Sequence, residues 1–142
     1  MTDIPPHTRL FKKWEPPEIQ HNKLTQWNWM VSHPENLSLG DGVDIGAFTY
    51  IQAEKGVVIE DDVQIGSHCS IYSVNTIDGT AGKIHIKKGS CIGTHSVILP
   101  NGELLTIGEY AKCGAFSFIK RNVKPREVVK MWNTIRRGII RS

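Results

Sequence analysis

Two histidines of this chain occupy the same place in two similar stretches of sequence. His68 lies in "IGSHCSI" (65–71) and His95 in "IGTHSVI" (92–98), whereas "IGAFTYI" (45–51) and "CGAFSFI" (113–119) carry phenylalanine there. A neutral imidazole can take a proton from a hydroxyl group at neutral pH, because the ordinary pKa of histidine is ~6.5. A histidine base is therefore the first chemistry that these residues suggest, and it depends on the elements that hold the two rings.

Aliphatic residues spaced six apart surround both histidines. A period of six fits neither a helix, at ~3.6 residues per turn, nor a single strand, at ~2. It predicts coils of three short strands joined by corners, each aliphatic residue pointing inward and stacking on the next coil ~4.8 Å away. The fourth place of each hexad is usually small, as a tightly wound coil requires. The blocks are Leu39-Ile45-Ile51, Ile59-Ile65-Ile71, Ile86-Ile92-Ile98 and Ile107-Cys113-Ile119.

The repeat predicts an all-β fold, a parallel β-helix of about four coils within a single domain, 1–142. The β-helix covers 37–122, and its largest insertion, 72–85, projects as a loop, where function usually lies. Residues 1–36 show no period and are expected to form an irregular N-terminal cap. Residues 123–142 are expected to form a C-terminal helical segment that begins at Pro125, with Val128, Val129, Trp132 and Ile135 on one face.

Composition and charge narrow the classes of function. The net charge of +3 divides into +7 for residues 120–142 and −4 for the rest, which favours an anionic ligand such as phosphate. Aromatic residues interleaved with the basic ones are nearly absent there, so nucleic-acid binding is not expected. No apolar run approaches ~20 residues and no signal peptide begins the chain, so we expect a cytoplasmic protein without membrane insertion. The three cysteines form no CxxC pair, so neither a disulfide framework nor a zinc knuckle is indicated.

Two outer columns of the predicted coils are rich in aromatic residues. One contains Phe48, His68, His95 and Phe116, and the other contains Tyr50, Ser70, Val97 and Phe118. A monomer would expose these apolar rings together, which is unfavourable in water. Burial against neighbouring subunits in a closed ring, such as a homotrimer, removes that exposure.

The segments "GSHCSIYSVNTIDGTAGKIHIKKGSCIGTHSVILPN" (66–101) and "GAFSFIKRNVKP" (114–125) carry a resemblance to a known family. They resemble the hexapeptide-repeat acyltransferases, and most of all the sugar-modifying acetyltransferases of bacterial surface-polysaccharide pathways. The resemblance implies a left-handed parallel β-helix, acetyl-CoA as acyl donor, and a hydroxyl or amine of a nucleotide-linked or lipid-linked sugar as acceptor. It also implies a homotrimer with active sites between neighbouring coils.

The chain departs from the family pattern in two places. Many relatives carry a histidine base after the asparagine of the projecting loop, whereas this chain reads Asn75-Thr76-Ile77-Asp78. Relatives usually end the last coil in a "GNPA"-like turn, but here Lys130-Met131-Trp132-Asn133 follows. The catalytic base and part of the coenzyme site therefore have to come from other residues.

We predict His68 as the catalytic base, because its coil leads directly into the loop at 72–85. The alternative is that His68 and His95 only pack in a subunit interface. Residues around the loop are candidates for binding the acceptor, although "IDG" also fits a plain tight turn; the acceptor set is Asn75, Thr76, Asp78, Lys83 and His95.

The resemblance places the coenzyme beside the later coils. Small residues there would let a pantetheine arm approach the backbone, and basic residues beyond them would bind the nucleotide phosphates. The coenzyme set is Gly93, Gly114, Ala115, Ser117, Lys120, Arg121, Lys124 and Arg126.

Two other functions compete with the transferase. One is a metal enzyme of the same fold, the γ-class carbonic anhydrase, whose zinc takes three histidines; no third histidine shares the repeat position of His68 and His95, so no metal site is predicted. The other is a non-catalytic β-helix that serves as an assembly or binding module. The missing loop histidine favours this module, while the polar insertion and the basic segment argue against it.

Overall fold

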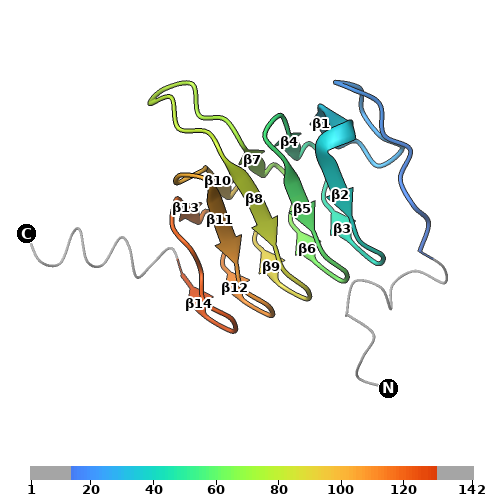
Figure 1. Ribbon diagram of the computed structural model, residues 1–142. Coiled ribbons are helices and arrows are strands. Elements are labelled where there is room, and N and C mark those ends of the chain that lie inside the picture. The colour runs from blue at the N-terminus through green and yellow to red at the C-terminus, as the bar shows by residue number, and fades with distance from the viewer. Residues whose placement is uncertain (1–13, 131–142) are drawn as a thin grey trace, which may run out of the picture.

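The computed structural model describes residues 14–130, which wind into a parallel β-helix with three sheets (Figure 1). Sheet A contains β1 (Met30–Ser32), β4 (Tyr50–Gln52), β7 (Ser70–Tyr72), β10 (Val97–Ile98) and β13 (Phe118–Ile119). Sheet B contains β2 (Leu37–Leu39), β5 (Val57–Ile59), β8 (Lys83–Ile86) and β11 (Leu104–Ile107). Sheet C contains β3 (Asp44–Ile45), β6 (Gln64–Ile65), β9 (Cys91–Ile92), β12 (Lys112–Cys113) and β14 (Val128–Val129). A short 3₁₀ helix, η1 (Pro34–Asn36), precedes β2.

The strand register confirms the predicted columns. In sheet A, Ile51 pairs with Ile71, Ile71 with Ile98, and Ile98 with Ile119. The same stacking runs through the isoleucines of the other two sheets, and these side chains form one buried core. The fourth places of the hexads are buried as well, and each comes directly after the turn residues of a corner, before the next strand begins. They are Val43, Thr49, Val63, Cys69, Ser90, Ser96, Ala111 and Ser117.

Residues 14–36 pack on the first coil at the N-terminal end. Strand β1 extends sheet A by pairing with β4, and Val31 and Trp29 are buried in the core. The Trp14 indole Nε1–H donates a hydrogen bond to the Val43 carbonyl (3.1 Å). The described part of the predicted N-terminal cap therefore covers this end of the core, mostly with irregular backbone.

The predicted C-terminal helix is wrong for residues 123–130, which continue the β-helix. Val123 pairs with Ile107, and β14 pairs with β12, so Val129 stacks on Cys113. Val123 and Val129 are six residues apart, so they repeat the hexad spacing across a corner at Pro125. Sheet pairing thus takes precedence over the helical pattern; Trp132 and Ile135, which suggested it, lie outside the described residues. No helix within residues 14–130 is long and apolar enough to cross a membrane.

Candidate functional site

Four stacked rings line the corner between sheets C and A. Their centroids are 5.4 Å apart for Phe48 and His68, 4.8 Å for His68 and His95, and 5.2 Å for His95 and Phe116. The two imidazole planes differ by only 6°. All four residues have a positive φ, between 57° and 64°, because each occupies the left-handed position of its corner. We call this stack the ring ladder; the two histidines lie in the outer column where the sequence placed them.

The two histidines of the ring ladder differ in their polar contacts. His95 Nδ1 lies 2.8 Å from Thr94 Oγ1, and that hydroxyl donates to the Ser67 carbonyl (2.9 Å). Among residues 14–130, the His68 ring contacts the Phe48 and His95 rings and has no side-chain hydrogen bond. Both side chains are exposed, so a ligand can reach either ring.

An apolar face adjoins the ring ladder on the outer side of sheet A. The register aligns Tyr50, Ser70, Val97 and Phe118 in one row, as the sequence predicted. Phe118 is 68% exposed, and Phe48 and Phe116 at the ladder's ends are exposed as well. The row and the ladder thus place exposed aromatic side chains on neighbouring parts of the C–A corner and sheet A.

The insertion between β7 and β8 projects from the corner between sheets A and B (Figure 1). The residues between the two strands, 73–82, form a loop whose ends are joined by an antiparallel bridge between Val74 and Ala81. Asn75 Oδ1 accepts a hydrogen bond from the Ile77 N–H (3.1 Å), and Asp78 Oδ1 accepts one from the Thr80 N–H (2.9 Å). Two of the predicted acceptor-binding side chains therefore shape the loop itself.

An ion pair joins this loop to the last full coil, because Lys120 Nζ contacts Asp78 Oδ2. The Lys120 ammonium, helped by the Thr80 N–H, holds the pKa of Asp78 well below its usual range. One member comes from the predicted acceptor set and the other from the predicted coenzyme set. The structure thus brings one residue of each set together at the A–B corner.

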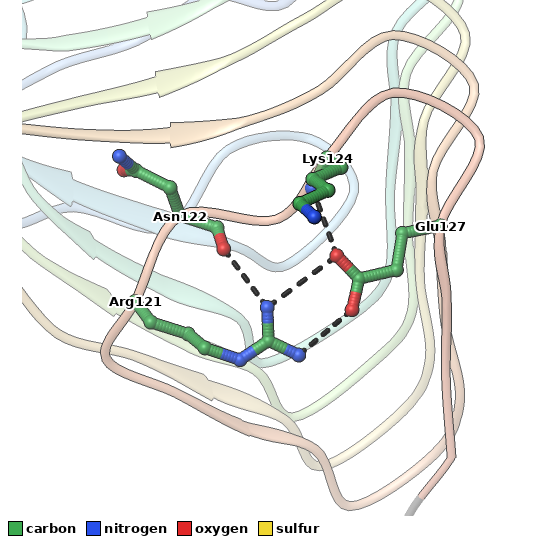
Figure 2. Close-up of polar contacts among 4 residues, drawn as sticks. All are labelled: Arg121, Asn122, Lys124 and Glu127. Carbon is green, nitrogen blue, oxygen red and sulfur yellow. Dashed lines mark hydrogen bonds and ion pairs between the residues drawn. The ribbon is translucent and has the colours of Figure 1, made fainter.

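Two of the other basic candidates, Arg121 and Arg126, have side chains that are engaged with groups of the chain itself. Arg121 forms a bidentate ion pair with Glu127, with Nη2 2.8 Å from Oε2 (Figure 2). Arg121 also donates a hydrogen bond to the Asn122 carbonyl, and the Lys124 backbone N–H donates one to Glu127 Oε1. The Arg121 guanidinium, followed by the Lys124 N–H, lowers the pKa of Glu127. Arg126 lies over the Tyr110 ring, 4.9 Å from its centroid. A phosphate at this corner would have to compete with these contacts for the guanidinium groups.

The small residues of the predicted coenzyme set have different surroundings. A Cβ on Gly93 would lie 2.4 Å from the Ala115 backbone nitrogen, so the stacking of the coils fills that space. A Cβ on Gly114 would meet the Val129 carbonyl oxygen at 3.3 Å and the Lys130 Cα at 3.9 Å. Ser117 is buried and donates to the Gly114 carbonyl (2.6 Å), whereas Ala115 is exposed. The exposed backbone of this set therefore lies at Gly114 and Ala115.

Sequence reasoning missed a histidine–carboxylate pair on the outer face of sheet B. His85 Nε2 lies 2.6 Å from Glu60 Oε2, and Glu60 Oε1 accepts a hydrogen bond from the Lys88 N–H (2.9 Å). Burial works to raise the pKa of Glu60, but the bonds from Lys88 and His85 outweigh it and lower that pKa. The signal in the sequence is weak, because the two residues are in neighbouring coils but not in register. Lys83, at the start of the same strand, is exposed.

Within residues 14–130, no three histidine, cysteine, aspartate or glutamate side chains are grouped so that they could hold a metal ion. The three cysteines are free thiols, and burial raises the pKa of each.

Comparisons with known proteins agree with this architecture. The sequence matches no protein-family model. It is 32% identical over 93 residues to a serine acetyltransferase of Buchnera aphidicola subsp. Schizaphis graminum, a match that covers 66% of this chain. The six-residue spacing of its stacked core residues makes the chain one built from hexapeptide repeats. The chain spans only about a third of that relative's length, since the match covers 34% of the serine acetyltransferase.

A solved structure shares the fold of this hexapeptide-repeat chain, a left-handed parallel β-helix. It is the crystal structure of AntD, an N-acyltransferase from Bacillus cereus in complex with dTDP and 3-hydroxybutyryl-CoA. The two chains superpose with a TM-score of 0.59 and 22% sequence identity, over 74% of this chain and 72% of AntD. At that identity the likeness concerns the fold.

Proposed function

We propose that this hexapeptide-repeat protein is an acyltransferase that moves an acetyl group from acetyl-CoA to a hydroxyl or amine of a sugar. The observation that carries the proposal is the 93-residue match to a serine acetyltransferase, which supports acetyl transfer as the reaction. The acyl-CoA and dTDP bound to AntD, on the same fold, favour a nucleotide-linked sugar as acceptor. Surface-polysaccharide synthesis in the cytoplasm would supply such an acceptor.

The residues allow direct transfer without an acyl-enzyme intermediate. The acceptor oxygen or nitrogen attacks the thioester carbonyl, the C–S bond breaks, and the electron pair leaves with the coenzyme sulfur. A histidine of the ring ladder takes the acceptor's proton and returns it to the thiolate. Backbone N–H groups at a corner stabilise the oxyanion that forms between these steps.

The apolar face of sheet A supports a homotrimer, the oligomer that the sequence resemblance implies. Phe48, Phe116 and Phe118 leave water when neighbouring subunits pack on this face. The ring ladder would then line the subunit interface, with its histidines beside the bound substrates. A closed ring of three subunits needs a heterologous contact, in which this face packs on a different face of the neighbouring subunit.

Isothermal calorimetry with acetyl-CoA tests the donor site. Ala115→Trp fills the exposed corner of the predicted coenzyme set, and Ala47→Trp is its matched control, because Ala47 follows Gly46 at the same repeat place in the first coil. We expect one site per subunit in the wild type and in Ala47→Trp, and loss of binding in Ala115→Trp with an unchanged circular dichroism spectrum. Absence of binding to the wild type would refute the transferase and favour the non-catalytic binding module.

Acceptor specificity follows from a panel assay in which free thiol released from acetyl-CoA is measured. The panel contains dTDP-linked amino sugars, the corresponding hydroxy sugars and L-serine. We expect turnover with the dTDP-linked sugars. Turnover with L-serine alone would mean that serine is the acceptor of this chain, as it is of the serine acetyltransferase. A parallel metal determination on the purified protein tests the carbonic-anhydrase alternative.

A further inference from the structure

The Thr94 hydroxyl has three polar neighbours but a single proton to donate. Thr94 Oγ1 lies 2.9 Å from the Ser67 carbonyl oxygen, 2.8 Å from His95 Nδ1 and 3.2 Å from Ser67 Oγ. Two oxygens at 2.9 Å need a proton between them, and a carbonyl has none to give. The Thr94 proton is therefore directed to the Ser67 carbonyl, and the lone pairs of Thr94 Oγ1 face the other two groups.

This arrangement determines which nitrogen of His95 carries the proton. Since Thr94 Oγ1 accepts at 2.8 Å, His95 Nδ1 must be the donor, and in the neutral ring Nε2 then keeps its lone pair. The Ser67 carbonyl is itself fixed, because it also accepts the His95 backbone N–H (3.0 Å). The network thus runs from one coil to the next and back to the same histidine.

His68 has no equivalent support. The residue before it, Ser67, has its hydroxyl directed to Thr94 rather than to the His68 ring. Within residues 14–130, the contacts of the His68 ring are its stacking partners, Phe48 and His95. Stacking holds the plane of the ring but does not select a tautomer.

We propose that Thr94 is a positioning residue that holds His95 with its proton on Nδ1, and that His95 Nε2, rather than His68, takes the acceptor's proton. The inference rests on the proposed acetyl transfer, whose base the sequence had assigned to His68. When the acceptor–carbon bond forms and the C–S bond breaks, the proton moves to Nε2 and then to the coenzyme thiolate, which leaves as the free thiol. Thr94 keeps the imidazolium oriented because Nδ1–H remains a donor in both protonation states.

Nitrogen-15 NMR of histidine-labelled protein measures the tautomer directly. The spectra are recorded near pH 8.5, well above the ordinary histidine pKa of ~6.5. We expect a protonated Nδ1 and an unprotonated Nε2 for His95 in the wild type and in Thr94→Ser, which keeps the hydroxyl. In Thr94→Val, which has nearly the same shape, the fixed tautomer should be lost. A protonated Nε2 in the wild type, or an unchanged spectrum in Thr94→Val, would overturn the positioning role.

Acetyl transfer to the best acceptor of the panel tests the base. His95→Gln should lower kcat by roughly 10²–10⁴-fold. Thr94→Val should lower kcat with little change in the KM for acetyl-CoA. His68→Gln should retain most of the activity. If His68→Gln carries the larger loss, the assignment to His95 is wrong while the transferase stands. If the wild type binds no acetyl-CoA in calorimetry, the proposed function is refuted. The assignment of His95 as the base is then refuted as well, whichever tautomer the spectra show.

Discussion

Gly93→Ala tests whether this glycine is needed for coil stacking or only for coenzyme approach. A Cβ at Gly93 would lie 2.4 Å from Ala115 N, 2.6 Å from Gly114 C and 2.7 Å from Ala115 Cα, all of them backbone atoms of the next coil. Ordinary contact begins at 3.4 Å, so the two coils have to separate at this corner. The φ of Gly93 lies outside the left-handed region, so alanine adds no backbone strain of its own.

The separation costs hydrogen bonds as well as packing. The Gly93 N–H donates to the Cys113 carbonyl (2.7 Å), and the Phe116 N–H donates to the Thr94 carbonyl (2.9 Å), on either side of the clash. Weakening two such bonds costs about 1–3 kcal/mol, and overpacking of a close-packed interior costs about 1–3 kcal/mol. We therefore expect Gly93→Ala to lower the free energy of unfolding by about 2–5 kcal/mol.

Gly114→Ala is the matched control, because it alters the same place one coil further along. Its Cβ would meet the Val129 carbonyl oxygen at 3.3 Å and the Lys130 Cα at an ordinary contact distance of 3.9 Å. We expect a loss below about 1 kcal/mol there, since the last coil can adjust. Urea unfolding followed by circular dichroism, at equal protein concentration, measures both values. Equal stability of Gly93→Ala and Gly114→Ala would refute the stacking argument and would leave the coenzyme as the reason for Gly93.

Three further predictions concern charge and assembly. Lys120→Ala removes the ion pair with the projecting loop, so amide hydrogen exchange in the loop should become a few-fold faster while the coils keep their protection. Because folding lowers the pKa of Glu127 from 4.5, the carboxylate stabilises the protein above that pH, and this stabilisation is lost as the pH falls through the folded-state pKa. The difference in unfolding free energy between wild type and Glu127→Gln should therefore shrink on acidification. A difference that grows below pH 4.5 would contradict the pairing. Phe118→Ser should shift the sedimentation coefficient from trimer towards monomer, whereas Val128→Ser, which changes another exposed apolar residue on sheet C, should not.

The core could be predicted from the sequence because stacking makes the pattern strictly periodic. Each inward place, such as Ile65, is repeated by Ile92 one coil later, so a single spacing fixes burial and register together. The same rule would have found the last coil from Val123 and Val129, but the apolar spacing around Val128 also fits a helix face. A strand and a helix can be distinguished here only by the pairing of Val123 with Ile107 and of Val129 with Cys113. This pairing depends on where the preceding coil ends.

The polar contacts could not be predicted in the same way. Lys120 and Asp78 are 42 residues apart, and their pairing depends on how the loop bends, which no repeat specifies. Arg121 and Glu127 face each other across the corner at Pro125. The sequence predicted a helix from Pro125, which would have had no corner there. The contact between Thr94 and His95 joins adjacent residues, but its meaning depends on the Ser67 carbonyl in the previous coil.

A rigid stack of this kind confines chemistry to its corners and loops. Inward places are filled by aliphatic side chains, and the backbone groups of the strands are used in pairing between coils. At the C–A corner the left-handed turn positions hold exposed rings at nearly constant separation, so a histidine there is oriented by its neighbours above and below before any ligand arrives. For His95, the preceding Thr94 hydroxyl and the Ser67 carbonyl to which it donates would then fix the nitrogen that carries the proton. Under the proposed acetyl transfer, the stacked coils would thus supply both the geometry and the tautomer that a base requires.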